Sequence, residues 1–512
     1  MMNIVISHRV KSHRVLGFSC FIWLFFIVSC KTNENREYSN VFVGKQTGTK
    51  LEAIGVELDP HFFSQNVTRE DGSKASDWQY VVDRVKKMEI QKFRVMALPP
   101  WYEPVNDNDD PHTTDRSKFT FDSPEMQSLY KVLDLAQEQN MEVCIVVWGC
   151  PTGVSLLDPD YAHVKTCFMA DPDKGGWITG PVDYDEWAEN YSALIKHLIE
   201  ERGYTCINEI TPVNEPDGGP LLTSTEYIEM ARILDARFKK EGLRDRIRFN
   251  LSDNTDTRTF YLIDCAENLQ DVADIFNSHT YIFGYDTPNH EIYDWEKNNV
   301  HIAASAGKKH LVGEFGSNQC VGATRQRDID LYARGVLMTR LVLNFLNAGA
   351  SGVSYWSLID QYYGKEADYQ QMQQLGLWKY IKEAYKTDST YTRINTDYEV
   401  RPQYYSYSLL TRFLKPGAEI YPIDLYEDFA IGTAFKDKEG KWTYVFANGT
   451  DTSKFIAINN ESIKGNFEIY RYEENSLPEN DDLITASETI KMNANKLQVD
   501  VRGNSVVLCR QK

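Results

Sequence analysis

The sequence lacks the features that would point to a nucleic-acid partner. Its 55 lysines and arginines are outnumbered by 74 aspartates and glutamates, which gives a formal net charge of −19, and no long basic run offsets this excess. Such a charge balance disfavours nucleic acid and acidic polymers as partners. Neutral ligands fit the composition best.

Patterned cysteines are also missing. No CxxC pair and no histidine-rich cluster suggests zinc, and we expect no metal and no organic cofactor. Cys20 and Cys30 lie in the N-terminal segment, which leaves seven of the nine cysteines for the folded part. An odd, scattered set is no disulfide framework. Only Cys150 and Cys167, which flank one loop, are a plausible pair in an oxidising compartment, and most of the others are expected to be buried thiols.

No glycine-rich phosphate loop follows any of the predicted strands, which disfavours the alternative of a doubly wound open sheet. Instead, short segments with nearly continuous apolar residues recur along the chain, as in parallel strands covered on both faces. There are eight of them: 51–58, 92–98, 142–149, 207–215, 247–254, 274–281, 310–317 and 351–358. Segments with helical spacing lie between them, for example 78–88, 126–139, 184–201, 224–242 and 327–349. The alternation predicts a (β/α)8 barrel.

After about residue 400 the pattern changes to alternating strands separated by Asn-Gly, Asn-Asn and Arg-Gly-Asn turns, which predicts a small antiparallel β-sandwich. The short segment 40–45 is expected to pair with it. We therefore divide the chain into a signal segment (1–30), a tether with a possible sandwich strand (31–50), a catalytic barrel (51–400) and a sandwich domain (401–512).

The N-terminus has the pattern of a targeting segment. Arg9, Lys11 and Arg14 precede the apolar run 16–28, which is too short to span a bilayer comfortably, and Cys30 follows in "IVSC". This resembles a bacterial lipoprotein signal, in which the cysteine becomes the lipidated first residue. We expect an exported, lipid-anchored monomer of the bacterial cell envelope, on the outer membrane; a plain secretory signal or an uncleaved anchor is the alternative.

Polar and aromatic residues recur at the strand ends, where the active sites of such barrels lie. They are Arg94, Trp148, Asn214, Glu215, His279, Tyr281, Glu314 and Trp356. Each one alone has an ordinary explanation, such as a solvated strand tip or core packing. Their joint placement at one end of the barrel favours a ligand site.

This ordered set resembles the retaining glycoside hydrolases of clan A. In that clan "NEP" closes strand 4 with the acid/base glutamate, and a second glutamate, here in "GEFGS", closes strand 7. The "HTY" of strand 6, the strand-8 tryptophan and the strand-2 arginine match as well. The segment 401–421 looks like the join between barrel and sandwich in families 30 and 39, whereas "HTY" suits family 5.

The resemblance implies a catalytic pair, Glu215 as acid/base and Glu314 as nucleophile, acting on a carbohydrate by double displacement. Arg94 and Tyr281 would keep Glu314 ionised, and Asn214 would donate to a sugar hydroxyl. The resemblance further implies a tryptophan platform at Trp356, and we expect His279 and Trp148 to contribute to substrate binding.

Several other residues stay open between substrate contact and a structural role: Glu57, Asp59, His61, Trp101, Trp177, Asp253, Asp360, Tyr362 and Tyr363. The acidic stretch 105–110 is interpreted as a solvated loop. A carbohydrate-binding lipoprotein without catalysis, and a transglycosylase using the same intermediate, are the alternatives to a hydrolase.

Overall fold

The computed structural model describes residues 37–60, 78–151, 178–255, 258–318, 328–362, 398–425, 427–460, 464–492 and 495–512, with short stretches between them. Tyr38–Lys512 forms one compact unit. Several sequence-based expectations lie outside the described residues: the signal segment, the lipidation of Cys30, the pairing of Cys150 with Cys167, and roles for His61, Trp177 and Tyr363.

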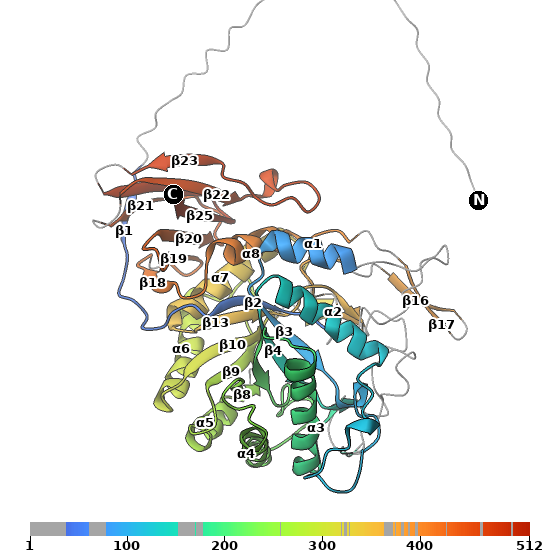
Figure 1. The fold of residues 1–512 in the computed structure, drawn as a ribbon. Coiled ribbons are helices and arrows are strands. Elements are labelled where there is room, and N and C mark those ends of the chain that lie inside the picture. Colours follow the sequence, from blue (N-terminus) through green and yellow to red (C-terminus); the bar gives the residue numbers. More distant parts are fainter. Residues whose placement is uncertain are drawn as a thin grey trace, which may run out of the picture. The chain divides into compact units, whose positions relative to one another are not determined.

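A closed barrel of parallel strands forms the centre of the compact unit (Figure 1). Its eight strands follow one another around the barrel in chain order. They are β2 (Ala53–Glu57), β3 (Lys92–Ala97), β4 (Glu142–Val147), β7 (Ile207–Thr211), β8 (Arg248–Asn254), β9 (Ile275–Thr280), β10 (Lys309–Phe315) and β13 (Gly352–Tyr355). Most of their residues are buried, as expected of strands with side chains in both the barrel interior and the helix layer. The predicted (β/α)8 barrel is confirmed.

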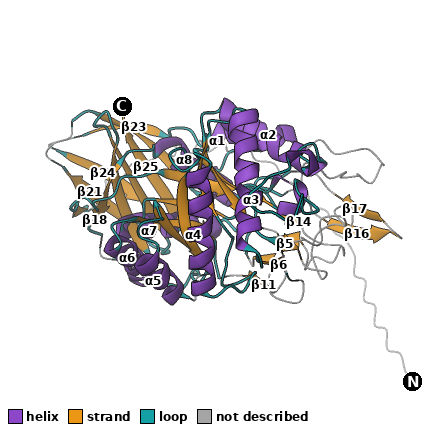
Figure 2. Cartoon of the chain, turned by 60° about the horizontal axis from the view of Figure 1, so that its bottom comes forward, coloured by secondary structure: helices purple, strands orange, loops and turns teal. Residues whose placement is uncertain are grey.

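Helices surround the strands (Figure 2). They are α1 (Trp78–Met88), α2 (Pro124–Glu138), α3 (Tyr184–Lys196), α4 (Ser224–Lys240), α5 (Thr259–Asn268), α6 (Asn289–Ser305), α7 (Ala333–Ala348) and α8 (Pro402–Phe413). Local sequence sets their ends: Thr223 and Glu226 form a capping box at the start of α4, and Gly349 ends α7 with a φ of 112°. No helix in the described part of the chain has the length and apolar character needed to cross a bilayer.

Helix α8 belongs to the outer layer of the barrel, since it packs against α7, α1 and β2. Its residues Tyr407 and Thr411 donate hydrogen bonds to the backbone carbonyls of Gly55 and Met88. The segment 401–421, which we expected to join the two domains, therefore consists of a barrel helix followed by the first strand of the C-terminal sheet.

The C-terminal part folds into two sheets. The larger one has the order β18-β19-β20-β25-β22-β23 and is antiparallel; the smaller one is β1-β21-β24. The strands are β1 (Ser39–Phe42), β18 (Glu419–Ile423), β19 (Ala430–Lys436), β20 (Trp442–Asn448), β21 (Lys454–Asn459), β22 (Asn466–Tyr472), β23 (Glu488–Lys491), β24 (Lys496–Val501) and β25 (Ser505–Gln511). Apolar side chains of both sheets form one core between them. The expected 40–45 segment overlaps β1, which pairs in parallel with β21.

The other face of the larger sheet packs against the barrel. Tyr332, just before α7, stacks on Tyr472 of β22 with ring centroids 4.5 Å apart. The two hydroxyls donate to each other's backbone carbonyls, at 2.9 and 2.6 Å. A Cβ at Gly335 of α7 would lie 2.4 Å from the Tyr472 hydroxyl, so the close packing of this helix depends on a glycine. Barrel and sheets thus share one continuous apolar core.

Short strand pairs follow the barrel strands at their carboxyl ends. They are β5 (Cys150–Pro151) with β6 (Ile178–Thr179), β11 (Cys320–Val321) with β12 (Arg325–Gln326), β14 (Gln361–Tyr362) with β15 (Met372–Gln373), and β16 (Glu383–Thr387) with β17 (Thr390–Ile394). Figure 2 shows β5, β6, β14, β16 and β17 gathered on one side of the barrel. This side is the one on which the strand-end residues lie.

Candidate active site

Arg94 on β3 is the hub of the strand-end residues. Its NH1 donates to Glu314 at 2.5 Å and to Glu57 at 3.0 Å, and its NH2 donates to Asn214 at 2.7 Å and to Asp253 at 2.8 Å. The guanidinium is buried, so these charge-assisted bonds are poorly screened by water. Arg94 thereby holds four side chains that come from four other barrel strands or strand ends.

Glu314 is positioned by a local irregularity of β10. The pairing of β10 with β9 shifts register between Val312 and Glu314, and a Cβ at Gly313 would lie 2.3 Å from the side chain of Asn277. A bulge of this kind re-aims the side chain that follows it. The carboxylate accepts from Arg94 through Oε1 and from the Tyr281 hydroxyl through Oε2, the latter at 2.7 Å.

Glu215 lies in the turn that follows β7. Its φ of 39° is in the left-handed region, which is uncommon for a residue with a side chain. Its carbonyl accepts from the backbone N–H groups of Gly218 and Gly219 at 2.8 and 3.1 Å, which closes the turn. The side chain is only partly buried, so Glu215 is the more accessible of the two glutamates.

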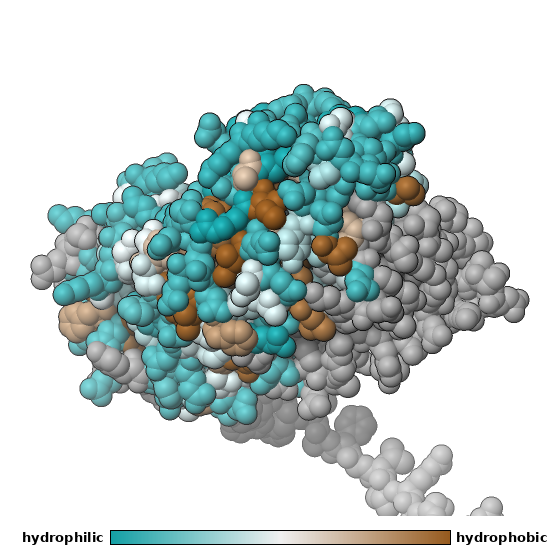
Figure 3. Space-filling model, turned by 90° about the horizontal axis from the view of Figure 1, so that it is seen from below, coloured by the Kyte–Doolittle hydropathy of each residue, from teal (hydrophilic) through white to brown (hydrophobic). Residues whose placement is uncertain are grey.

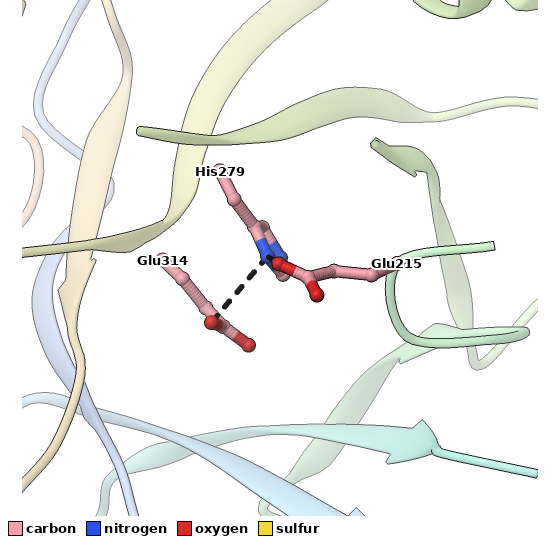
Figure 4. A group of neighbouring side chains, drawn as sticks. All are labelled: Glu215, His279 and Glu314. Atoms are coloured by element: carbon pink, nitrogen blue, oxygen red, sulfur yellow. Dashed lines mark hydrogen bonds and ion pairs between the residues drawn. The ribbon is translucent and has the colours of Figure 1, made fainter. Parts of the chain in front are cut away.

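His279 on β9 lies between the two glutamates (Figure 4). Its Nδ1 is 2.9 Å from Oε1 of Glu215 and 3.4 Å from Oε2 of Glu314, while its Nε2 is 3.2 Å from Oδ1 of Asp253. Burial lowers the pKa of His279, but Glu314, Asp253 and Glu215 together raise it well above its usual range. The surrounding carboxylates therefore favour the protonated form of His279.

Asp253 is the partner that secures both cations. It lies at a register shift of β8, with a φ of 53°, and contacts Arg94 on one oxygen and His279 on the other. Burial raises its pKa, yet Arg94 and His279 outweigh this effect, so the net shift is downward. Asp253 is consequently the firmly ionised carboxylate of the group.

Glu57 and Glu314 share NH1 of Arg94, and burial raises the pKa of both. For Glu314 the neighbouring His279 and Arg94 oppose the rise. We expected Arg94 and Tyr281 to keep Glu314 ionised. Both contact its carboxylate, and Arg94 lowers its pKa as expected, but burial raises that pKa by more, so the net shift is upward. Because both carboxyl groups contact NH1 of Arg94, the protonation of one is linked to that of the other.

Distance alone would allow a metal ion at this site. One ligand atom each of Glu215, His279 and Glu314 lies within 4.8 Å of the others. A metal ligand must be a neutral imidazole, however, whereas the three carboxylates favour the protonated ring of His279. The arrangement suits hydrogen bonding and proton transfer better than coordination.

The two expected aromatic residues lie together. Trp148, just after β4, stacks on Trp356, just after β13, with ring centroids 5.4 Å apart and an interplanar angle of 23°. Both side chains are 5% exposed. Trp356 therefore offers an edge or a partly covered face rather than a bare platform. Asn214, whose Oδ1 is held by Arg94, has its amide nitrogen left for another acceptor.

Several residues left open by the sequence have structural contacts. Asp360 forms a paired ion contact with Arg401 at 2.7 and 2.8 Å and accepts from the backbone of Gly376. Trp101 is buried in the hydrophobic core. The buried thiols are confirmed for Cys144, Cys206, Cys265 and Cys509. These groups lie in the framework around the site.

Solved structures share this architecture. The catalytic domain of the family 30 xylanase C from Talaromyces cellulolyticus superimposes with a TM-score of 0.61 at 14% identity, covering 93% of this chain and all (100%) of that one. An endo-β1,6-glucanase gives 0.57 at 16% identity (93% and 95% covered), and a family 39 glycoside hydrolase from the gut symbiont Bacteroides cellulosilyticus gives 0.56 at 12% (90% and 81%). The fold is that of clan A glycoside hydrolases.

At these identities the likeness concerns the fold. No protein-family model and no curated protein matches the sequence. The resemblance to clan A, and to families 30 and 39 in the presence of the C-terminal sheets, is confirmed at this level. Of the expected residues, six lie in one network of contacts: Arg94, Asn214, Glu215, His279, Tyr281 and Glu314. Glu57 and Asp253 also belong to this network, although their sequence positions did not distinguish them from other strand-end carboxylates.

Proposed function

We propose that the protein is a retaining glycoside hydrolase in which Glu314 is the nucleophile and Glu215 the acid/base. One observation carries the proposal: an oxygen of Glu215 lies within 4.8 Å of an oxygen of Glu314. Retaining enzymes place the two carboxyl groups about 5–5.5 Å apart, whereas inverting enzymes need about 6.5–9.5 Å to admit a water. The short separation favours a covalent intermediate.

In the first step Glu314 attacks the anomeric carbon while Glu215 protonates the departing oxygen. Tyr281 and Arg94 each hold one oxygen of Glu314, which fixes the carboxylate in one orientation for in-line attack. His279 holds Oε1 of Glu215, so Oε2 is the oxygen left to face the leaving group. The free amide nitrogen of Asn214 is suited to donate to a sugar hydroxyl near the reacting carbon.

In the second step Glu215, now a carboxylate, removes a proton from water, and the water displaces Glu314 from the sugar. The imidazolium of His279 stabilises the negative charge that Glu215 carries between the steps. The same water position could be taken by a sugar hydroxyl, which would give transglycosylation with no change in the protein groups.

Composition and fold support a proposal for the substrate class. We propose a β-linked polysaccharide or oligosaccharide, neutral or mildly substituted. A net charge of −19 does not suit a strongly acidic polymer, and the similar structures include a xylanase and an endo-β1,6-glucanase. The stacked pair Trp148 and Trp356 provides an apolar wall of the kind that contacts sugar rings.

The direct test is a panel of oligosaccharides and aryl β-glycosides followed by proton NMR, which identifies the first-formed anomer before mutarotation. A retained β-anomer is expected. An inverted anomer would contradict the double displacement. Measurable binding of a glycan without any turnover across the panel would instead favour the carbohydrate-binding alternative.

We further propose that the protein is exported and held on the envelope by a lipid on Cys30. The basic residues before the apolar run 16–28 and the cysteine after it support this. Exposed large apolar side chains in the described part of the chain, such as Phe42, Val182 and Phe260, come from separate elements, and Figure 3 shows apolar groups interrupted by hydrophilic residues on one face. This favours a monomer. Radiolabelled palmitate should label the wild type but not Cys30→Ser.

A further inference from the structure

A second group of carboxylates lies where the loop between β3 and α2 meets helix α3. Asp107 comes from the loop, and Glu186 and Glu189 come from α3. One oxygen of each lies within 4.8 Å of the others. Residues three apart on a helix share a face, so Glu186 and Glu189 both point to the loop.

These carboxylates are buried rather than solvated. The exposed fraction is 9% for Asp107, 8% for Glu186 and 1% for Glu189. Burying three acidic groups within contact distance is costly unless a cation or protons neutralise them. Burial raises the pKa of Glu186 to about 7. Burial also raises the pKa of Glu189, and the opposing effects of Thr114 and Arg237 on Glu189 are smaller.

An independent observation points to a missing ligand. Both oxygens of Glu189 and Oδ1 of Asp107 have no hydrogen-bond partner within the described part of the chain, and Oδ1 of the adjacent Asn106 has none either. Buried carboxylate oxygens are normally satisfied. Two of the three clustered carboxylates thus keep buried oxygens without a hydrogen-bond partner in the described part of the chain.

The nearby arginine does not fill this role. Arg237 is 3.8 Å from Oε1 of Glu189, which is too long for a hydrogen bond. Its NH1 and NH2 donate instead to the Pro111 carbonyl at 2.6 Å and the Thr114 hydroxyl at 3.1 Å. Arg237 therefore holds the loop through Pro111 and Thr114, and most of the negative charge of the three carboxylates stays uncompensated.

We propose that Asp107, Glu186 and Glu189 bind a calcium ion. All the candidate ligand atoms are oxygens, which suits a hard cation and not zinc or copper. Ca²⁺–oxygen distances of about 2.3–2.6 Å put opposite ligands about 4.6–5.2 Å apart, and the oxygens here fall within 4.8 Å. Calcium is favoured over magnesium because it accepts irregular sets of carboxylates with few waters.

The ion would join the β3–α2 loop to α3. That loop is already anchored at its start: the Tyr102 hydroxyl donates to Asn190 at 2.6 Å, and Asn190 donates to Glu103 at 2.9 Å. The cation would fix its middle, where Asp107 also accepts from the backbone of Asp115. Since the loop follows the strand that carries Arg94, calcium would stabilise the wall beside the candidate active site. This adds a structural metal to a chain for which the sequence led us to expect none.

The test uses the whole chain, stripped with EGTA and then titrated with CaCl₂ in a calorimeter and in thermal unfolding. One ion per chain should bind, and Tm should rise by about 2–5 °C at a calcium concentration 100 times Kd. The rise should be absent, or need at least about tenfold more calcium, in Glu189→Gln. The matched control is Glu229→Gln, the same change on the exposed face of α4.

A second measurement compares the stability of the wild type and Glu189→Gln without calcium. Its expected result differs from that for a carboxylate with a purely structural role. Without calcium, Glu189→Gln should be at least as stable as the wild type, because one buried like charge is gone; with calcium the order should reverse. If that variant fails to fold, Asp107→Asn should show the same reversal. No calcium-dependent rise in the wild type, an unchanged rise in Glu189→Gln, or an equal rise with MgCl₂ would overturn the proposal. None of these readouts depends on glycosidase activity.

Discussion

NH1 of Arg94 lies 2.5 Å from an oxygen of Glu314 and 3.0 Å from an oxygen of Glu57. One cation thus holds two carboxylates whose protonation states are linked. Burial raises the pKa of both carboxyl groups, and protonation of Glu57 would leave Glu314 as the ionised partner of Arg94. The nucleophile of the proposed mechanism therefore depends on a neighbour that does not itself need to contact the substrate.

Replacing this arginine tests the network. In Arg94→Lys a single ammonium cannot reach Glu57, Asn214, Asp253 and Glu314 together, so buried carboxylates are left unpaired. We expect a loss of about 3–5 kcal/mol in unfolding free energy and a fall of at least about 10²-fold in kcat. Arg232→Lys, at an exposed ion pair with Asp271, is the control for both measurements. Wild-type stability and kcat in Arg94→Lys would show that the network carries neither property.

The protonation of His279 predicts a pH dependence. Its pKa in the folded chain is raised well above the usual value, which is about 6.5 in an unfolded chain. Between the unfolded and the folded pKa, His279 is protonated in the folded chain but not in the unfolded chain. The protonated ring therefore contributes its full stabilisation of the folded state below about pH 6.5, and this contribution is lost as the pH rises through the folded pKa.

The measurement compares urea unfolding of wild type and His279→Gln from pH 5 to 9. The stability advantage of the wild type over the variant should shrink as the pH rises above about 6.5. The control for the substitution itself is His301→Gln, at an exposed histidine of α6. A constant or growing advantage for His279 with rising pH would contradict the imidazolium assignment.

Trp356 should contribute to sugar binding through its ring. Trp356→Ala is expected to raise KM and lower kcat, since it removes both the ring and the stacking partner of Trp148. Trp356→Phe keeps an aromatic face and should recover part of the loss. Steady-state kinetics on one oligosaccharide, with Tm as a check on folding, separates these outcomes. Unchanged kinetics in a folded alanine variant would mean that the tryptophan only packs.

Much of this architecture could be predicted from the sequence, because the strands of a parallel barrel are buried on both faces and show as nearly continuous apolar segments. Glu215 and Glu314 stand at the ends of such segments, which was enough to place both at the carboxyl-terminal end of the barrel. The role of α8 was not evident, since a helix that closes the barrel and a linker to the next domain have the same polar–apolar spacing.

The partners of Arg94 could not be predicted in the same way. Asp253 reaches the guanidinium because its backbone has a positive φ at a register shift, and nothing in "LSDN" requires that conformation. The stacking of Trp148 on Trp356 joins strand ends more than 200 positions apart in the sequence, a relation that only barrel closure creates. The acidic stretch 105–110, interpreted as solvated, is partly buried because Asp107 meets carboxylates of α3.

Glu215→Gln removes the proposed proton donor while nearly preserving its shape. Natural glycosides, which need protonation of the departing oxygen, should lose about 10²–10⁴-fold or more in kcat/KM, and aryl glycosides with acidic phenols far less. Added azide should restore turnover and yield a glycosyl azide with the retained anomer, since azide needs no general base. Equal losses for both kinds of substrate, with no azide product, would show that Glu215 is not the acid/base.

The central claim is that Glu314 forms a covalent bond with the sugar. The most direct measurement is trapping with a 2-deoxy-2-fluoro glycoside bearing a good leaving group, chosen from the sugars that the wild type hydrolyses, followed by peptide mass spectrometry. The account predicts one added sugar per chain, on the peptide that contains Glu314, and no labelling of Glu314→Gln. A label on Glu57, Asp253 or Glu215 instead, at full occupancy, would contradict it.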